Sequence, residues 1–526
     1  MSTLKSLFKQ TFIYGLATVL PRMLSFLLVR LHTDESVLKS VADYGDVSLI
    51  YSYFVLFNVI LAYGMETAFF RFFHKEDNKA KVVGTSSISL IVSSVLFFVL
   101  ALAFQNQIAN VIDIKAEYIN LVIWILLLDA LVIIPFAWLR ANAKPIKYAF
   151  IKILNVAINL GLNLFLLLWL KDLATESSLL ASIYRPNFEI NYIFIANLVA
   201  SAVTLLIMLP FYFKITYTFN TNLWKQMIRY AFPVLIAGVA FSINETFDRI
   251  LLDKLLPENI AKTEIGMYSA CYKLGMFMTL FVTAYKLGVE PFFFSHANTE
   301  NPKKNYARIL EYFVIFGSVI LLGVVVFADV LKVILIGDEA YWQAMLIVPI
   351  ILLANLCLGI YHNLSVWYKI TDRTKFGAYI SVFGAFLTLL LNIWLIPKIS
   401  YVGSALATLA AYASMMMISY YFGKKYYPIP YNLKKISVYL LLSIGLSAIT
   451  FYGFRGNYVV GISALIVFLG LVFQLEKNDL RKEKMANVQS LVDGYTSFSG
   501  DFRRTHGERL NKAGFRQDAA YIANLN

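Results

Sequence analysis

Charged residues are scarce in this chain. Only 15% of its 526 residues are Asp, Glu, Lys or Arg, and 59% are hydrophobic. Soluble domains usually carry about 25% charged residues, so the deficit excludes the several soluble domains that this length would otherwise suggest. Cysteine is also nearly absent, because only Cys271 and Cys357 occur, both inside apolar runs. A disulfide framework is therefore not expected.

Metal, nucleotide and catalytic motifs are missing as well. The histidines are scattered without metal-like spacing, and no P-loop occurs. These histidines are His32, His74, His296, His362 and His506. No polar stretch between the apolar runs is longer than the nineteen residues from Lys171 to Glu189, which leaves no room for an extramembrane catalytic domain. We therefore expect a protein that is not an enzyme and that needs no metal or cofactor.

Long apolar runs are what the sequence has in abundance. A spanning helix needs about 20 apolar residues, and runs of this length with little period-two alternation do not resemble barrel strands. The pattern predicts an all-α polytopic membrane protein with about fourteen transmembrane helices. They are expected near 9–31, 45–73, 80–104, 118–141, 148–170, 190–213, 227–252, 264–294, 306–330, 342–366, 376–396, 402–422, 435–453 and 458–474.

The first run holds Pro21, Arg22 and Arg30 and lacks a small-residue cleavage site, so we interpret it as a span and not as a removed signal peptide.

The positive charges predict the orientation of the spans. With both termini in the cytoplasm, the N-terminus and the six inside loops with their flanks hold 22 Lys and Arg, and the seven outside loops hold nine. That bias has the sign of the positive-inside rule. The net charge of +14 is then a topology signal with anionic lipid headgroups as partners, and nucleic acid is not needed to explain it.

A weak internal repeat divides the spans into two sets of six. Tyr44-Gly45-Asp46 and Gly64-Met65-Glu66 in the second span correspond to Ile265-Gly266-Met267 and Gly288-Val289-Glu290 in the eighth. Six spans per half give a parallel repeat, in which substrate sites lie between the halves. We expect an N-terminal lobe at 1–215, a C-terminal lobe at 216–425, two extra spans within 426–474 and a polar cytoplasmic tail at 475–526.

Ionisable residues inside the spans concentrate in spans 1, 2, 7 and 8. A charge at the bilayer centre costs about 2.5–3.5 kcal/mol on insertion scales, so such residues should face protein or water. The ten residues are Arg22, Arg30, Asp46, Glu66, Glu245, Asp248, Arg249, Lys273, Lys286 and Glu290. We expect these four spans to line one hydrated cavity between the halves. Arg30, Asp46 and Asp248 lie near span ends, where they can instead reach the interface.

Cations in such a cavity suit a diphosphate, because guanidinium binds phosphate oxygens bidentately and stays charged. Arg22, Arg249, Lys273 and Lys286 are the candidate substrate-binding residues. Acids at this depth are candidates for proton or cation coupling. These acids are Glu66, Glu290 and Glu245. The spacing i, i+4 also lets Glu245 pair with Arg249, and Lys286 with Glu290, so these residues could merely neutralise each other.

Several stretches resemble the polysaccharide-export family of the multidrug/oligosaccharidyl-lipid/polysaccharide exporter superfamily. They are Asp248 to Leu252, Glu264 to Leu274, Leu391 to Pro397 and Gly403 to Thr408. The resemblance covers about residues 9–474. It implies a V-shaped fold of two lobes, with a cavity lined by spans 1, 2, 7 and 8. It also implies a bacterial inner-membrane flippase that moves undecaprenyl-diphosphate-linked oligosaccharides to the outer leaflet by alternating access, for surface polysaccharides such as lipopolysaccharide.

Three alternatives remain open. A cation-coupled multidrug exporter of the same superfamily predicts an acid-dominated cavity, whereas the ten charges are balanced five to five. A peptidoglycan-precursor flippase fits the same residues. A membrane glycosyltransferase or polymer ligase usually needs a sizeable outside loop with catalytic acids, and the short loops argue against it.

Overall fold

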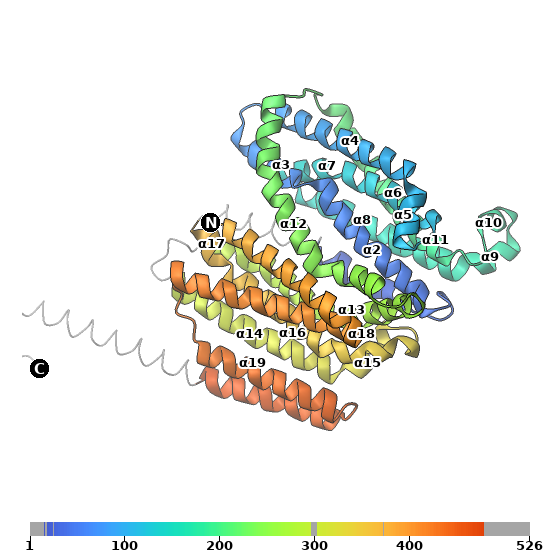
Figure 1. Cartoon of the computed structure of the whole chain (residues 1–526). Coiled ribbons are helices and arrows are strands. Elements are labelled where there is room, and N and C mark those ends of the chain that lie inside the picture. The colour runs from blue at the N-terminus through green and yellow to red at the C-terminus, as the bar shows by residue number, and fades with distance from the viewer. Residues whose placement is uncertain (1–14, 16–17, 25, 296–301, 372, 478–526) are drawn as a thin grey trace, which may run out of the picture. The chain divides into compact units, whose positions relative to one another are not determined.

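The computed structural model describes residues 15, 18–24, 26–295, 302–371 and 373–477, and in it the chain is helical with no strand among these residues. Figure 1 shows the arrangement. The chain divides into two compact units, Met1–Gly461 and Ile462–Asn526. The described part of the second unit, residues 462–477, belongs to a helix that runs from Tyr458 to Lys477. The predicted tail lies outside the described residues from position 478 onward.

Helices follow one another with short connections. The elements of the N-terminal half are α2 (Val41–Ala62), α3 (Met65–Lys75), α4 (Lys79–Ala103), α5 (Gln105–Ile112), α6 (Ala116–Leu131), α7 (Ile133–Ala141), α8 (Pro145–Leu164), η1 (Phe165–Trp169), α9 (Leu170–Glu176), α10 (Ser178–Ile183) and α11 (Glu189–Lys214). Those of the C-terminal half are α12 (Thr221–Leu255), α13 (Glu258–Ser295), α14 (Pro302–Val326), α15 (Ala328–Leu335), η2 (Glu339–Ile347), α16 (Val348–Leu364), α17 (Val366–Ile370), α18 (Lys375–Tyr426), α19 (Leu433–Ala448) and η3 (Ile449–Gly453).

The spans agree with the fourteen that the sequence predicts. Twelve helices of the described chain are long and apolar enough to cross a membrane. One of them, α18, is really two helices, because Ile399 and Ser400 have non-helical backbone angles and Ser400 has a positive φ of 48°. The predicted spans 376–396 and 402–422 lie on either side of that break. The remaining predicted span is the first, whose described residues 18–24 and 26–31 are helical.

Short polar side chains start several of these helices. The Ser40 hydroxyl accepts from the Asp43 backbone N–H, and the Asp43 carboxylate accepts from the Ser40 N–H, which is a capping box for α2. At the start of α4, α12 and α19, an Asn side chain accepts a hydrogen bond from the backbone N–H three residues on. These caps lie at the ends of apolar runs, so they fix where each span begins.

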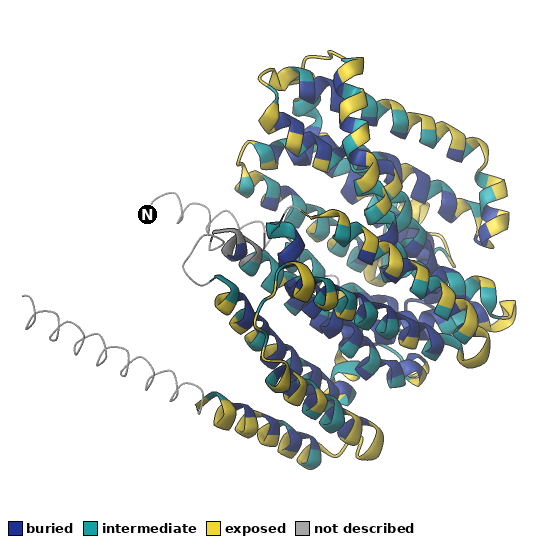
Figure 2. Cartoon of the chain, turned by 60° about the vertical axis from the view of Figure 1, so that its left-hand side comes forward, coloured by how far each residue is buried: buried dark blue, intermediate teal, exposed yellow. Residues whose placement is uncertain are grey.

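Each half packs mainly within itself. The elements from α2 to α11 contact one another, as do those from α12 to η3. The main contacts that cross between the halves join α2, α3 and α4 to α12, and α2 to α13. Figure 2 shows that exposed residues line the outer faces of many helices, whereas buried ones gather where helices meet. Two long helices of the C-terminal half thus form the seam against the N-terminal half.

Reciprocal glycines bring α2 and α13 into backbone contact at this seam. A Cβ on Gly45 would lie 1.9 Å from the carbonyl oxygen of Lys262, and a Cβ on Gly266 would lie 2.1 Å from that of Val41. Small residues permit such close approach between membrane helices. Gly45 and Gly266 are equivalent in the predicted repeat, and each meets the residue four positions before the other. The contact therefore supports the repeat.

Ion pairs surround this contact. The Lys262 ammonium lies 2.9 Å from the Asp46 carboxylate of α2 and 3.5 Å from the Asp253 carboxylate of α12, and it donates to the Asp113 backbone carbonyl at 2.9 Å. Asp46 thus lies against the opposite half. By the predicted topology this end of the helices is the outer one.

Substituting Gly45 tests the backbone contact. Gly45→Ala should lower the free energy of unfolding by about 1–3 kcal/mol, the usual effect of overpacking, because even a methyl group overlaps the Lys262 carbonyl. The measurement is the melting temperature of the purified protein in detergent. Gly161→Ala in α8 is the matched control, because no atom lies within 4 Å of a Cβ there. Equal melting temperatures for the two variants would contradict the close approach of α2 and α13.

Candidate functional site

Arg22 reaches from the first helix to the C-terminal half. Its side chain is half-buried, and its guanidinium donates to the Thr283 hydroxyl of α13 at 3.0 Å. The charge in the middle of the first span therefore contacts protein, as the cost of inserting a charge into the bilayer requires.

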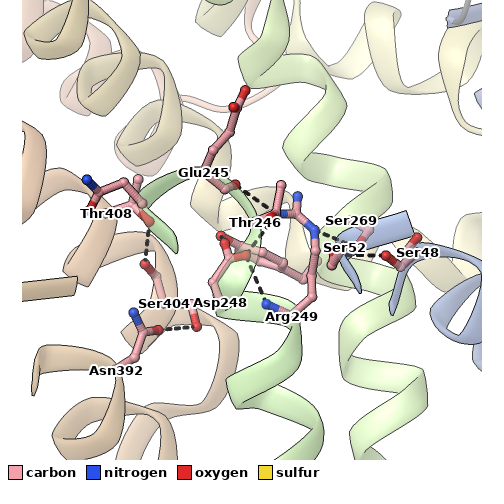
Figure 3. A network of polar contacts seen from close by, with 12 residues as sticks. Ser48, Ser52, Glu245, Thr246, Asp248, Arg249, Ser269, Asn392, Ser404 and Thr408 are labelled. Carbon is pink, nitrogen blue, oxygen red and sulfur yellow. Dashed lines mark hydrogen bonds and ion pairs between the residues drawn. The ribbon is translucent and has the colours of Figure 1, made fainter. Parts of the chain in front are cut away.

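Glu245 of α12 lies among the predicted cations. Its carboxylate interacts electrostatically with Arg22, Arg249 and Lys273, which come from three different helices. Within the described part of the chain this carboxylate accepts no hydrogen bond and forms no ion pair within 4 Å. In Figure 3 it points away from the Asp248–Arg249 pair. We call Arg22, Glu245, Arg249 and Lys273 the central cluster.

Arg249 is the most constrained member of the central cluster. Its side chain is buried, and its guanidinium lies 2.8 Å from the Asp248 carboxylate and 4.5 Å from the ring centroid of Tyr272. The other Asp248 oxygen accepts a 2.5 Å hydrogen bond from the Tyr268 hydroxyl. A buried ion pair of this kind is held by its hydrogen bonds, and removing one partner leaves an uncompensated charge. Arg249 is therefore firmly positioned by its neighbours.

This pairing differs from the sequence expectation. The i, i+4 spacing would allow Arg249 to pair with Glu245, but it pairs with its neighbour Asp248 and reaches only the backbone carbonyl of Glu245, at 3.3 Å. Asp248 was expected to be able to reach the interface, but it is 3% exposed. The reason is the rotation of α12, which buries 248 and 249 together. Spacing alone does not give that rotation.

Lys273 is the second cation of the central cluster on the C-terminal half. It lies on α13 and is half-buried, and among the described residues its ammonium makes no hydrogen bond and no ion pair. Its electrostatic interactions are with Glu245, Arg249 and His32. Asp248 neutralises Arg249, which leaves the cations Arg22 and Lys273 and the acid Glu245 in the central cluster. The net charge of the central cluster with Asp248 is therefore positive.

The other predicted residues lie elsewhere. Lys286 is thirteen residues beyond Lys273 on α13, about 20 Å at 1.5 Å per residue, and interacts electrostatically with His362. Glu66 forms a 2.7 Å ion pair with Arg140 of α7. Glu290 lies in α13, but its side chain is outside the described part of the structure, and so is any pair that it forms with Lys286.

Two polar groupings were not predicted as sites. In the N-terminal half, the Ser201 hydroxyl donates to Asp129 at 2.8 Å, and Lys152 interacts electrostatically with Asp129 and Glu66. In the C-terminal half a buried chain of amides and hydroxyls links α12 to both arms of α18, part of which Figure 3 shows. Its members are Asn244, Thr388, Asn392, Ser404 and Thr408. The i, i+4 spacing of Thr388 with Asn392, and of Ser404 with Thr408, was the available signal.

Chemically, the central cluster can hold an anion. Arg22 offers a planar fork of donors, and Lys273 offers an ammonium without a hydrogen-bonded partner among the described residues. No group of three or more potential metal ligands was found in the described residues. Two cations from different helices beside one carboxylate suit a multiply charged oxyanion better than a cation.

Solved structures of membrane transporters share this fold. A lipid II flippase, MurJ, in an inward closed conformation superimposes with a TM-score of 0.70 at 16% identity, covering 88% of this chain and 99% of that one. An inward-facing multidrug resistance transporter of the MATE family gives 0.62 at 12% identity, covering 81% and 96%. A MOP superfamily transporter from Pyrococcus furiosus gives 0.58 at 12% identity, covering 82% and 96%. At these identities the likeness concerns the fold.

Sequence comparison gives the family. No curated protein matches the chain significantly. The family model described as polysaccharide biosynthesis protein matches residues 7–295, which is more than half of the chain and includes Arg22, Glu245, Arg249 and Lys273. The chain therefore belongs to the polysaccharide biosynthesis protein family.

Proposed function

We propose that the protein flips an undecaprenyl-diphosphate-linked oligosaccharide from the inner to the outer leaflet of the bacterial cytoplasmic membrane, for surface polysaccharide synthesis. The observation that carries the proposal is the central cluster. Its net charge is positive, and the Lys273 ammonium makes no hydrogen bond among the described residues. The family match supports a polysaccharide precursor as the substrate. Both termini are proposed to be cytoplasmic, as the charge bias predicts.

Arg22 and Lys273 are proposed to bind the diphosphate. They come from two helices, so the bound headgroup would bridge the first helix and α13. The lipid tail stays in the bilayer, because moving it through water would expose its apolar surface. The sugar enters with the headgroup. Arg249, held by Asp248 and Tyr272, would contribute its field rather than a direct contact.

The seam at Gly45 and Gly266 is proposed to close the outer end of the pathway. Alternating access requires one end to be closed while the other is open. The glycine contact and the ion pairs of Lys262 join the two halves at that end. Opening toward the outer leaflet would require these contacts to separate. Because the Asp46–Lys262 pair is partly exposed, water can take over its hydrogen bonds when it breaks.

A reconstituted transport assay tests the function directly. Purified protein in liposomes should translocate a fluorescent undecaprenyl-diphosphate oligosaccharide. The peptidoglycan precursor lipid II and a cationic dye serve as the other two substrates. Faster translocation of lipid II would favour the peptidoglycan-precursor alternative, and export of the dye alone would favour the multidrug exporter. Failure with all three substrates would refute the proposed function.

Arg22 substitutions test the headgroup contact. Arg22→Ala should reduce the apparent affinity for the lipid-linked sugar by about 10–100-fold, because a hydrogen bond to a charged group contributes about 1.5–3 kcal/mol. Arg22→Lys keeps the charge but loses the fork, so it should be impaired less. Surface-polysaccharide complementation, with expression checked by blot, measures the same effect in cells. Arg30→Ala is the control, because Arg30 lies on the same helix and only approaches Asp34, at 3.9 Å.

A purely structural role for Arg22 predicts a different result. If Arg22 only neutralises Glu245, the double variant Arg22→Ala with Glu245→Gln should recover transport. Full complementation by a normally expressed Arg22→Ala protein would refute the headgroup role outright.

Glu245 is the acid that we propose for ion coupling, ahead of Glu66 and Glu290. An anionic headgroup would compete with the Glu245 carboxylate for its two neighbouring cations. The carboxylate would then lose these cations or take up a proton. Glu245→Gln should therefore flatten the dependence of transport on pH or sodium. Glu66→Gln is the control. The side chains of Glu66 and of its partner Arg140 are each 42% exposed, and exposed ion pairs contribute about 0–1 kcal/mol to stability. Loss of the ion dependence in Glu66→Gln with an unchanged Glu245→Gln would assign coupling to Glu66.

A further inference from the structure

A half-open apolar cavity lies within the N-terminal half and includes no member of the central cluster. Its volume is about 270 Å³, and its walls come from α2, α4, α5 and α6. Tyr53, Phe57, Ala101, Ile112 and Ile123 represent these walls. The lining carries no charged side chain, and the tyrosine is its one polar residue.

The size and lining of the cavity suit a hydrocarbon chain. Protein interiors contain few voids larger than a water molecule, and water enters a void only where polar groups bind it. An apolar cavity of about 150 Å³ stays dry and binds benzene, so this larger one can take several methylenes. Leu100 and Phe104 line it and are 50% and 54% exposed, so the opening meets the surface of a bilayer-spanning helix.

One end of the cavity carries accessible charges. Ile112 and Ile114 line it, and Asp113 between them has a side chain that is 76% exposed. The Lys254 ammonium lies 3.0 Å from the Asp253 carboxylate and donates to the backbone carbonyl of Val111 at 2.9 Å, and its side chain is 42% exposed. Lys115 follows Ile114 and is also exposed. Asp113 and Lys115 lie between two candidate spans, and Lys254 lies at the end of the candidate span Thr221–Leu255, so we expect these residues at the depth of the lipid headgroups.

We propose that this cavity binds one acyl chain of a glycerophospholipid from the leaflet at that end, with the phosphate held by Lys254 and Lys115. The Asp113 carboxylate lies 3.9 Å from the Lys262 ammonium but is 76% exposed, so together with Lys254 and Lys115 it suits a headgroup that has both an anionic and a cationic group. The predicted topology makes this the outer leaflet.

The bound lipid would support the seam between the halves. Tyr53 and Phe57 belong to α2, which contacts α12 and α13 on its other faces. In the opposite half, Lys254 donates to Val111 in the last turn of α5, and Lys262 donates to Asp113 in the connection between α5 and α6. A chain in the cavity therefore fills the space behind the helix that carries Gly45.

Native mass spectrometry of the full chain, extracted in mild detergent, tests the proposal. The wild-type protein should retain one phospholipid. Ala101→Trp fills the cavity, because Ala101 is 6% exposed and lines it, and should lower this occupancy at least about fivefold. Val99→Trp is the matched control on the same helix, because Val99 is 55% exposed and does not line the cavity. Ala101→Leu serves as the second variant if the tryptophan prevents folding.

Two further arms separate the possible occupants. Lys254→Gln combined with Lys115→Gln places no side chain in the cavity but should still lower phospholipid occupancy. If this variant retains as much phospholipid as the wild type, the headgroup assignment is wrong. Added undecaprenyl phosphate should not displace the phospholipid; displacement would make the tail of a transported lipid the occupant and overturn the proposal. Equal phospholipid retention by Ala101→Trp and Val99→Trp would mean loosely associated bilayer lipid only, and would also overturn it. None of these results depends on the transport assay.

Discussion

The cost of a charge in hydrocarbon governs how this protein is arranged. Each ionised side chain within a span must find an opposite charge, hydrogen bonds or water. Asp248 and Arg249 meet this requirement by pairing with each other and with Tyr268. Arg22 meets it by crossing to Thr283, which joins the first helix to α13. The charges of the first helix, α12 and α13 therefore lie where these helices meet, and helices without ionised side chains are free to face lipid or to pack as scaffold.

The same constraint explains what the sequence could predict. Long apolar runs give the fourteen spans directly, because a helix is the one open structure that satisfies its own backbone in lipid. The concentration of charge in four spans predicts which helices gather. Arg22, Glu245, Arg249 and Lys273 of three of these spans interact electrostatically, whereas Glu66 of the second span pairs with Arg140. The equivalence of Gly45 and Gly266, found as a weak repeat, corresponds to a reciprocal contact. These features depend on hydropathy and spacing, which a sequence contains explicitly.

The pairing of individual charges could not be predicted in the same way. Glu245 and Asp248 both lie within about one turn of Arg249 on α12, so the side-chain rotamers that the surrounding residues impose decide which carboxylate it meets. Lys286 shares α13 with Lys273, but the length of that helix places it about 20 Å away. Glu66 forms an ion pair with Arg140, a residue that the sequence analysis counted among the positive charges of the cytoplasmic loops. Such choices depend on tertiary packing, and one sequence does not contain that information.

The seam and the central cluster are mechanically connected, because they lie on the same helices. Gly266 and Lys273 are seven residues apart on α13, which is two turns on nearly the same face. On α12, Glu245 and Asp253 are eight residues apart, and the Asp253 carboxylate lies 3.5 Å from the Lys262 ammonium. Moving α13 away from Gly45 must therefore also move Lys273 relative to Arg22. An anion that bridges Arg22 and Lys273 would oppose or favour that movement, and so couple headgroup binding to the state of the outer end.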